Sequence, residues 1–198
     1  MLRKLLTFGT SICLCLGIFT APVHAEEEKD YTSTNSITTI KTEEEIKADL
    51  DLQVMEDYPE YAGLIKARAT ETITNKLGNP ETRYANLGDA GGQPANGYIF
   101  NTGGYIYWAD GGYNVNVNIN FSWGLVGLSV SAGKASSSVT GLGAYCPPNV
   151  RCKLNIGKDI TVQRYEYWLR DTSTGNTQYL GVYNTITAQT VHLNIYEG

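Results

Sequence analysis

The chain has 198 residues, of which 42% are hydrophobic and 18% charged, and its formal net charge is −5 at pH 7. This length suits one domain that buries roughly 70% of the surface exposed by its unfolded chain. The acidic balance argues against nucleic acid as a partner, because binding to phosphates needs a basic surface.

The N-terminus has the three parts of a secretory signal peptide. A basic start is followed by an apolar stretch at 5–19, and Val23 and Ala25 are the small or aliphatic residues that a signal peptidase requires. The stretch is shorter than the roughly 20 residues of a spanning helix. Large aliphatic residues precede Cys13 and Cys15, where lipoprotein processing needs small ones. We therefore expect cleavage after Ala25 and secretion without lipidation or a cell-wall sorting motif, as in many exported bacterial proteins.

Four segments are expected along the chain: a signal peptide at 1–25, an acidic disordered segment at 26–41, a helical segment at 42–78 and an antiparallel β-domain at 79–198. The second segment is rich in Glu, Ser and Thr and has little to bury, which predicts disorder. Two interpretations of the front stay open. It is a pro-region removed by cleavage in the glycine-rich stretch at 78–96, or its helices cap the sheet.

Helix signals follow the acidic segment. Thr42 and Glu45 have the spacing of a capping box. Apolar residues at four-residue intervals then predict a helix over 43–57. Pro59 is typical of a first helical turn and predicts a second helix that ends near Leu77.

The period of the apolar residues changes to two beyond Pro80. Apolar residues alternate with Asn from Tyr113 to Trp123, which predicts a strand with one apolar and one polar face. The stretch at 171–176 predicts a hairpin turn between two further strands. The expected fold is therefore mainly β: an antiparallel β-sandwich or open barrel of about 7–9 strands, preceded by one or two N-terminal helices.

The two cysteines beyond the signal peptide should pair in an oxidising exterior, giving a Cys146–Cys152 disulfide. The ring that they close holds two prolines and a basic residue, a rigid shape that some serine-protease inhibitors use for docking. A simple stapled turn is the alternative. This candidate binding loop comprises Pro147, Pro148, Asn149, Val150 and Arg151.

Few residues are suited to catalysis. His192 is the single histidine beyond the signal peptide, and it lies within the last predicted strand. A carboxylate pair for glycoside hydrolysis has Glu166 as its main candidate, although a solvated strand position explains that residue equally well. Ligand spacings typical of zinc or calcium are missing from the sequence. We expect no catalytic residues, no metal site, no cofactor and no enzyme activity, with a hydrolase as the alternative.

The strand with strict alternation has the composition of a membrane-inserting β-hairpin. It is uncharged from Tyr113 to Gly133, and a membrane-spanning strand needs roughly 9 to 11 residues with one face for lipid and one for water. The alternative is an inner strand that faces a protein core. The candidate hairpin lies within 113–139, and its apolar residues are Tyr113, Val115, Val117, Ile119, Phe121, Trp123, Leu125 and Val126.

Aromatic residues are frequent, with 14 Tyr and 3 Trp. Rows of such side chains on a sheet stack on sugar rings or anchor a protein partner, although strand propensity and core filling also favour them. The candidate aromatic surface comprises Tyr105, Tyr107, Tyr165, Tyr167 and Trp168.

These features predict a secreted, non-catalytic β-domain that binds at the cell surface or to an extracellular partner. A toxin or bacteriocin-like protein that inserts its hairpin into membranes is the alternative from another class, and a protease inhibitor that presents the disulfide loop is a third. The candidate partners are the cell envelope, a membrane or an extracellular protein, and no nucleic acid.

Overall fold

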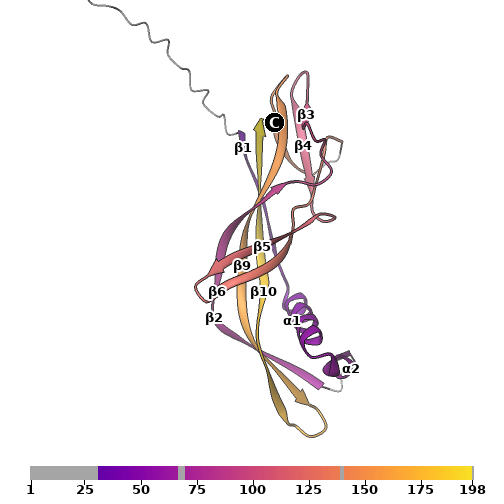
Figure 1. Ribbon diagram of the computed structural model, residues 1–198, viewed down its shortest axis with the longest axis vertical. Coiled ribbons are helices and arrows are strands. Elements are labelled where there is room, and N and C mark those ends of the chain that lie inside the picture. Colours follow the sequence, from indigo (N-terminus) through magenta and orange to yellow (C-terminus); the bar gives the residue numbers. More distant parts are fainter. Residues whose placement is uncertain (1–30, 67–69, 139–140, 198) are drawn as a thin grey trace, which may run out of the picture.

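The structure is a computed structural model that describes residues 31–66, 70–138 and 141–197. The expected signal peptide and the first residues of the acidic segment lie outside the described residues. The molecule is elongated, with long twisted strands running along its axis, two short helices beside one half and a group of shorter strands at the other end (Figure 1).

Three helical segments precede most of the strands: α1 (Glu43–Asp57), the 3₁₀ turn η1 (Pro59–Tyr61) and α2 (Ala62–Lys66). The strands are β1 (Tyr31–Ile40), β2 (Thr70–Asp89), β3 (Tyr98–Ile99), β4 (Gly104–Ala109), β5 (Asn114–Phe121), β6 (Gly124–Ser131), β7 (Lys134–Ser136), β8 (Leu142–Cys146), β9 (Arg151–Asp171) and β10 (Thr177–Glu197).

The main sheet has the strand order β1-β10-β9-β2, and the short β3 also pairs with β9. All of these pairings are antiparallel. The strands β9 and β10 have 21 residues each, which corresponds to about 70 Å of extended chain. They meet at the predicted hairpin turn, where the Asp171 carboxylate accepts hydrogen bonds from the backbone of Ser173 and Thr174. Gly175 completes the turn at φ 74°.

Two smaller sheets accompany the main sheet. One has the order β7-β4-β8, and the other is the hairpin β5-β6. The expected class is confirmed: the fold is mainly antiparallel β with helices near the N-terminal region, and the part of the chain that the structure describes forms no closed barrel.

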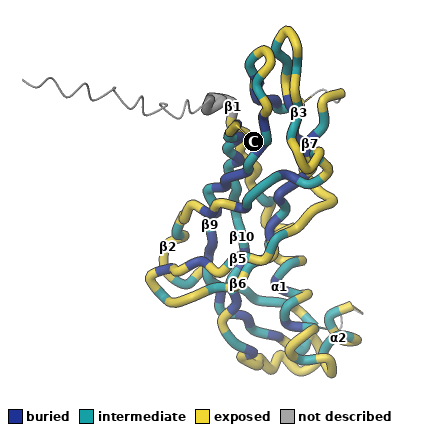
Figure 2. Tube along the Cα trace, turned by 45° about the horizontal axis from the view of Figure 1, so that its top comes forward, coloured by how far each residue is buried: buried dark blue, intermediate teal, exposed yellow. Residues whose placement is uncertain are grey.

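Two apolar clusters hold these layers together. Figure 2 shows the buried parts of the chain in dark blue. The sheet core lies between the main sheet and the two smaller sheets and contains Ile156, Ile160 and Leu193 among its fully buried residues. The helix core lies between α1 and the opposite face of the main sheet, where Leu50 packs with Tyr167. Strand β9 therefore contributes to both cores: its buried apolar residues face the sheet core as far as Val162 and the helix core from Tyr165 onward.

The helix α1 confirms its sequence signals. It spans the predicted residues, and both hydrogen bonds of the capping box are present, from the Glu45 amide to the Thr42 hydroxyl at 3.2 Å and from the Thr42 amide to the Glu45 carboxylate at 2.8 Å. Leu50 and Val54 on the predicted stripe are buried.

Two expectations about the front of the β-domain were wrong. Residues 31–40, expected to be disordered, form β1 along the edge of β10. The second helix ends at Lys66, and the residues from Thr70 onward form β2 and pair with β9. The β-branched residues Thr70, Thr72 and Ile73 suit a strand, and this long pairing outweighs a helix-like spacing. Residues 78–89 of the stretch considered for pro-region cleavage lie within β2.

Candidate functional site: the β5–β6 hairpin

The hairpin β5–β6 forms its own two-stranded ladder, separate from the strand order of the main sheet. It lies across the main sheet, next to β2 and β9 (Figure 1). Backbone pairing continues from β5 to the Ala132 amide, which donates to the Tyr113 carbonyl at 2.8 Å. Each arm therefore has about nine paired residues.

The alternation in the sequence produces two chemically different faces. The apolar face packs onto the sheet core, with Ile119, Phe121 and Val130 at 7%, 4% and 2% exposure. The apolar face comprises Val115, Val117, Ile119, Phe121, Val126, Leu128 and Val130. The outer face comprises Asn114, Asn116, Asn118, Asn120, Leu125, Gly127, Ser129 and Ser131.

The turn of the hairpin has two residues. It consists of Ser122 and Trp123, because Phe121 already pairs with Gly124. Leu125, one of the apolar residues of the candidate hairpin, is paired with Asn120 on the outer face and is 69% exposed. Val126 lies on the apolar face as expected. Adjacent residues of a strand point to opposite faces, so Leu125 and Val126 lie on different sides of the hairpin.

Glycines in the left-handed region flank the base of the hairpin. Gly112 precedes β5 at φ 78°, and Gly133 follows β6 at φ 66°. A Cβ at Gly133 would lie 2.3 Å from the Trp108 indole nitrogen and 2.5 Å from the Ala109 carbonyl oxygen, so no other residue fits there. Glycine also permits large backbone rotations. Both arms are thus connected to the rest of the fold through residues that tolerate a change of direction.

A charged contact from β2 holds the tip. The Ser122 amide donates to the Glu81 carboxylate at 3.1 Å, and the Ser122 hydroxyl donates to the same carboxylate. Arg83 forms an ion pair with Glu81 at 2.6 Å and donates to the Asn120 carbonyl at 3.3 Å. The Ser122 hydroxyl is the main cause that holds the pKa of Glu81 below its usual value, with smaller contributions from the Ser122 amide and Arg83 and an opposing one from burial.

The aromatic residues of the tip are placed between two guanidinium groups. The Phe121 and Trp123 rings stack with centroids 5.1 Å apart and an angle of 3° between their planes. Arg83 lies 5.8 Å from the Phe121 centroid and Arg164 of β9 lies 5.7 Å from the Trp123 centroid. These are the separations of cation–π pairs. We call Glu81, Arg83 and Arg164 the tip contacts.

One polar atom at the docked tip lacks a hydrogen-bond partner among the described residues. The Trp123 indole nitrogen is buried and has no hydrogen-bond partner among the described residues, and leaving such a donor unpaired costs about 1–3 kcal/mol. A groove of about 430 Å³ also remains between β2 and β5, lined by Arg83, Val117 and their neighbours. The hairpin is therefore held by its apolar face and its tip contacts rather than by close packing along its whole length.

A buried cation lies near the base of the hairpin. The Lys158 side chain is 2% exposed, and its ammonium group lies 3.2 Å from the Gln189 side-chain oxygen, 3.8 Å from the Asp110 carboxylate and 5.6 Å from the Trp108 ring centroid. Burial lowers the pKa of Lys158, and Asp110 partly opposes this effect. Asp110 belongs to the loop between β4 and β5, so this cation connects the main sheet to the start of the hairpin.

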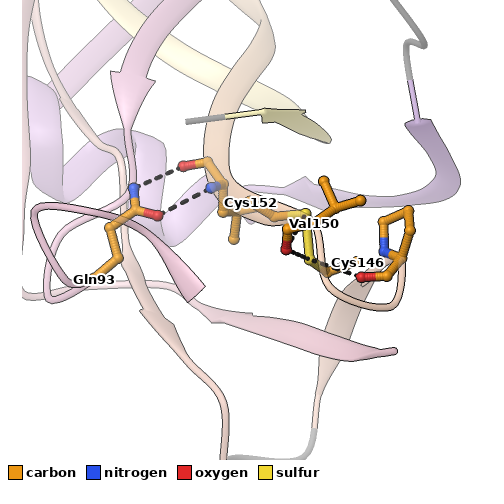
Figure 3. Close-up of a disulfide and its surroundings, with 6 residues drawn as sticks. Gln93, Cys146, Val150 and Cys152 are labelled. Atoms are coloured by element: carbon orange, nitrogen blue, oxygen red, sulfur yellow. Dashed lines mark hydrogen bonds between the residues drawn. A yellow bond between two sulfur atoms is a disulfide. The ribbon is translucent and has the colours of Figure 1, made fainter. Parts of the chain in front are cut away.

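The predicted disulfide loop lies at the end of the molecule formed by the shorter strands. Cys146 and Cys152 are bonded and fully buried (Figure 3). Beside the loop, the Gln93 side chain pairs with the backbone of Leu154 through two hydrogen bonds of 3.0 and 2.9 Å. Arg151 is exposed but belongs to β9, where it pairs with Ile99. Pro148 and Asn149 form the exposed part of the ring, and Pro147 and Val150 are partly covered.

The structure separates the members of the candidate aromatic surface. Tyr105 is exposed and Tyr107 half-buried on β4. Tyr165 and Tyr167 are 4% and 0% exposed in the helix core, so the expectation that they form a surface was wrong. Helix α1 covers that face of β9, and the Tyr167 hydroxyl donates to Asp51 of the helix at 2.6 Å.

Trp168 of the same candidate surface lies on the other face of β9. It is partly exposed and contacts Tyr179 of β10, with the ring centroids 4.8 Å apart. It shares no contact with Tyr105 or Tyr107 of the small sheet, so it is not part of the same surface.

His192 meets an acid, but not in a cleft. Its Nε2 atom lies 2.7 Å from the Asp159 carboxylate, and the Tyr84 ring is 6.2 Å away. Both partners of the ion pair are more than a third exposed, and the described residues place no hydroxyl in hydrogen-bonding contact with the imidazole. Glu166 pairs in register with Asn75 and Val182. Among the described residues, no group of three or more His, Cys, Asp or Glu side chains could hold a metal ion.

No helix within 31–66, 70–138 and 141–197 is both long enough and apolar enough to cross a membrane.

These elements define a class of protein: an antiparallel β-protein whose main sheet carries an uncharged, amphipathic hairpin with a ladder of its own. Comparisons with models of protein families, with curated proteins and with solved structures gave no match.

Proposed function

We propose that this protein is a secreted, non-catalytic protein that acts on membranes by inserting the β5–β6 hairpin. The observation that carries the proposal is the combination of an uncharged two-faced hairpin with an independent ladder. Undocking it breaks side-chain contacts and the tip contacts, and leaves the hydrogen bonds of the main sheet intact.

The dimensions and faces of the hairpin support this proposal. About nine paired residues in each arm, extended by the turn, approach the roughly 9 to 11 residues of a membrane-spanning strand. The apolar face would exchange the sheet core for lipid, at little cost in transfer free energy, while the Asn and Ser side chains would face water. Both tip aromatics suit a bilayer interface, where the Trp123 indole finds the hydrogen-bond partner that the docked state lacks.

Insertion implies assembly. A single hairpin in lipid has two open edges, and unpaired backbone groups in the hydrocarbon region cost several kcal/mol each. Hairpins from several copies of the chain would therefore have to pair into a closed barrel. The polar face of each hairpin would line the interior of that barrel, as in other membrane-spanning barrels.

A matched pair of substitutions tests the proposal. Val117 and Asn116 are neighbours on opposite faces of β5. Val117 is only partly buried in the docked state, so a lysine can extend its ammonium group to water there. Near the bilayer midplane a lysine on the lipid face costs about 2–4 kcal/mol, a factor of about 30 to 900.

We expect the chain from Glu26 onward to release dye from vesicles of phosphatidylcholine and phosphatidylglycerol. Val117→Lys should lose this activity, while Asn116→Lys should keep it and shift the conductance toward anions. Circular dichroism and thermal melting check that both variants fold. Absence of dye release by the parent chain, or equal loss in both variants, would contradict the proposal.

A further inference from the structure

A second feature lies away from the hairpin, on the outer face of the β7-β4-β8 sheet. Tyr105 and Tyr107 of β4 and Tyr145 of β8 lie on this face, while Ile106 and Trp108 face the sheet core and are buried. Tyr105 is 49% and Tyr145 45% exposed. We call the three tyrosines the tyrosine face.

The rings of the tyrosine face form one continuous aromatic surface. The Tyr105 centroid lies 6.1 Å from that of Tyr107, with 27° between the ring planes, and 5.5 Å from that of Tyr145, with 65° between the planes. Tyr105 and Tyr145 are also direct cross-strand partners. Because the central ring contacts both others, a ligand that covers one ring reaches a second.

Close contact with glycines fixes the positions of these rings. A Cβ at Gly143 would lie 2.9 Å from the Tyr107 ring, and one at Gly103 would lie 2.3 Å from the Tyr145 hydroxyl. Both rings therefore rest directly on backbone. The Cys146–Cys152 disulfide begins at the residue after Tyr145 and further restrains this end of the sheet. Such a surface loses little conformational entropy when a ligand binds.

The hydroxyl groups of the tyrosine face have no partner among the described residues. Elsewhere in the chain Tyr58, Tyr61, Tyr167 and Tyr196 each donate a hydrogen bond to a protein oxygen at 2.6–3.0 Å. The free hydroxyls of Tyr105, Tyr107 and Tyr145 thus leave several donors and acceptors at the rim of an apolar surface.

Charge on this face is confined to one edge of the sheet. Within the strands β4, β7 and β8 the single charged residue is Lys134, which pairs with Ala109 at the far edge from Tyr145. Ser136 is the partner of Tyr107 on that side. The three tyrosine rings, which lie toward the opposite edge, complement a neutral ligand that combines apolar and hydroxyl groups.

We propose that the tyrosine face binds a neutral oligosaccharide. The C–H faces of two adjacent sugar rings stack on the tyrosine rings, and sugar hydroxyls exchange hydrogen bonds with the free phenols. This site goes beyond the membrane activity proposed above: it attaches the protein to a glycan-bearing surface through the end of the molecule that carries the disulfide.

Calorimetric titration with neutral oligosaccharides tests the site, using glucose, galactose, mannose and N-acetylglucosamine hexamers as probes. Tyr105→Ala and Tyr145→Ala should each weaken binding about tenfold, the effect of losing one stacking contact. Tyr105→Phe keeps the ring and removes the hydroxyl, and should weaken binding by about two- to tenfold. Tyr179→Ala is the control, because Tyr179 is 47% exposed on β10, away from the tyrosine face.

Two results would overturn the proposal: no binding of any probe at millimolar concentration, or binding that survives both alanine substitutions. The outcome is independent of the membrane proposal, because the titration contains no lipid. The Val117→Lys variant should bind the oligosaccharide as the parent chain does, even if it fails to release dye.

Discussion

Truncation of Phe121 to alanine should release the hairpin without unfolding the main sheet. Phe121 is 4% exposed in the sheet core, and a Phe→Ala change in a core costs about 3–5 kcal/mol. The hairpin shares its ladder with no other strand among the described residues, so we expect this loss to favour undocking. The population of undocked hairpin should then rise by a factor of about 150 to 5,000.

Native-state hydrogen exchange measures this change residue by residue. An undocked two-stranded hairpin is marginally stable in water, so its amides should exchange once it leaves the sheet. We expect Phe121→Ala to lower protection at residues 114–131 and to leave protection at residues 154–162 of β9 close to that of the parent chain.

A control variant locates the effect. Tyr183 is 8% exposed in the helix core, and Tyr183→Ala should cost a similar free energy while leaving the protection of the hairpin relative to β9 unchanged. If Phe121→Ala lowers the protection of β9 as much as that of the hairpin, the two are one cooperative unit, and the reasoning behind a detachable hairpin is refuted.

Three further predictions concern stability. Burial, followed by the nearby Asp57 carboxylate, raises the pKa of Tyr183 to about 12. An unfolded tyrosine ionises near pH 10, so the contribution of Tyr183 to the free energy of unfolding is complete below pH 10 and is lost as the pH rises to about 12. Denaturant titrations across this range should show a smaller loss of stability for Tyr183→Phe than for the parent chain. Replacing Cys146 and Cys152 together by serine should lower the free energy of unfolding by about 2 kcal/mol, and an unchanged denaturation midpoint would contradict this. Thr42→Ala should lower it by about 1 kcal/mol, and Thr42→Ser should not.

Elements with local signals could be predicted from the sequence. The capping box at Thr42 and the apolar stripe that follows it specify α1 within a few residues of chain. The turn at 171–176 and the alternation from Tyr113 are equally local, and both are present in the structure as predicted. In each case the residues that form the element also carry its pattern.

Elements that depend on distant partner strands could not be predicted from the sequence. The stretch after Pro59 has apolar residues at helical spacing, but β2 forms because Thr70 onward pairs with β9, whose paired residues lie between 66 and 101 positions later in the chain. β1 likewise depends on β10. Neither pairing has a signal in the segment itself, so the tertiary contact decides.

The candidate site was likewise predictable only in its local part. The amphipathic hairpin follows from its alternation, whereas the tip contacts come from Glu81, Arg83 and Arg164 on strands far from the turn in sequence. Nothing in their neighbourhood indicates a contact with Ser122. Tyr165 and Tyr167 alternate with the polar residues Arg164 and Glu166, but the sequence of β9 does not show that the distant helix α1 covers the tyrosine side.

The position of β10 has a consequence for how the protein acquires its fold. β10 follows every other strand in the chain, yet it lies between β1 and β9 and supplies Val191, Leu193 and Ile195 to the sheet core. The helix α1 can form early because its signals are local, but among the described residues β1 has no hydrogen-bonded partner strand until β10 is available. Contacts of such long sequence separation also form slowly. The main sheet therefore cannot be completed until the residues of β10, Thr177–Glu197, are available.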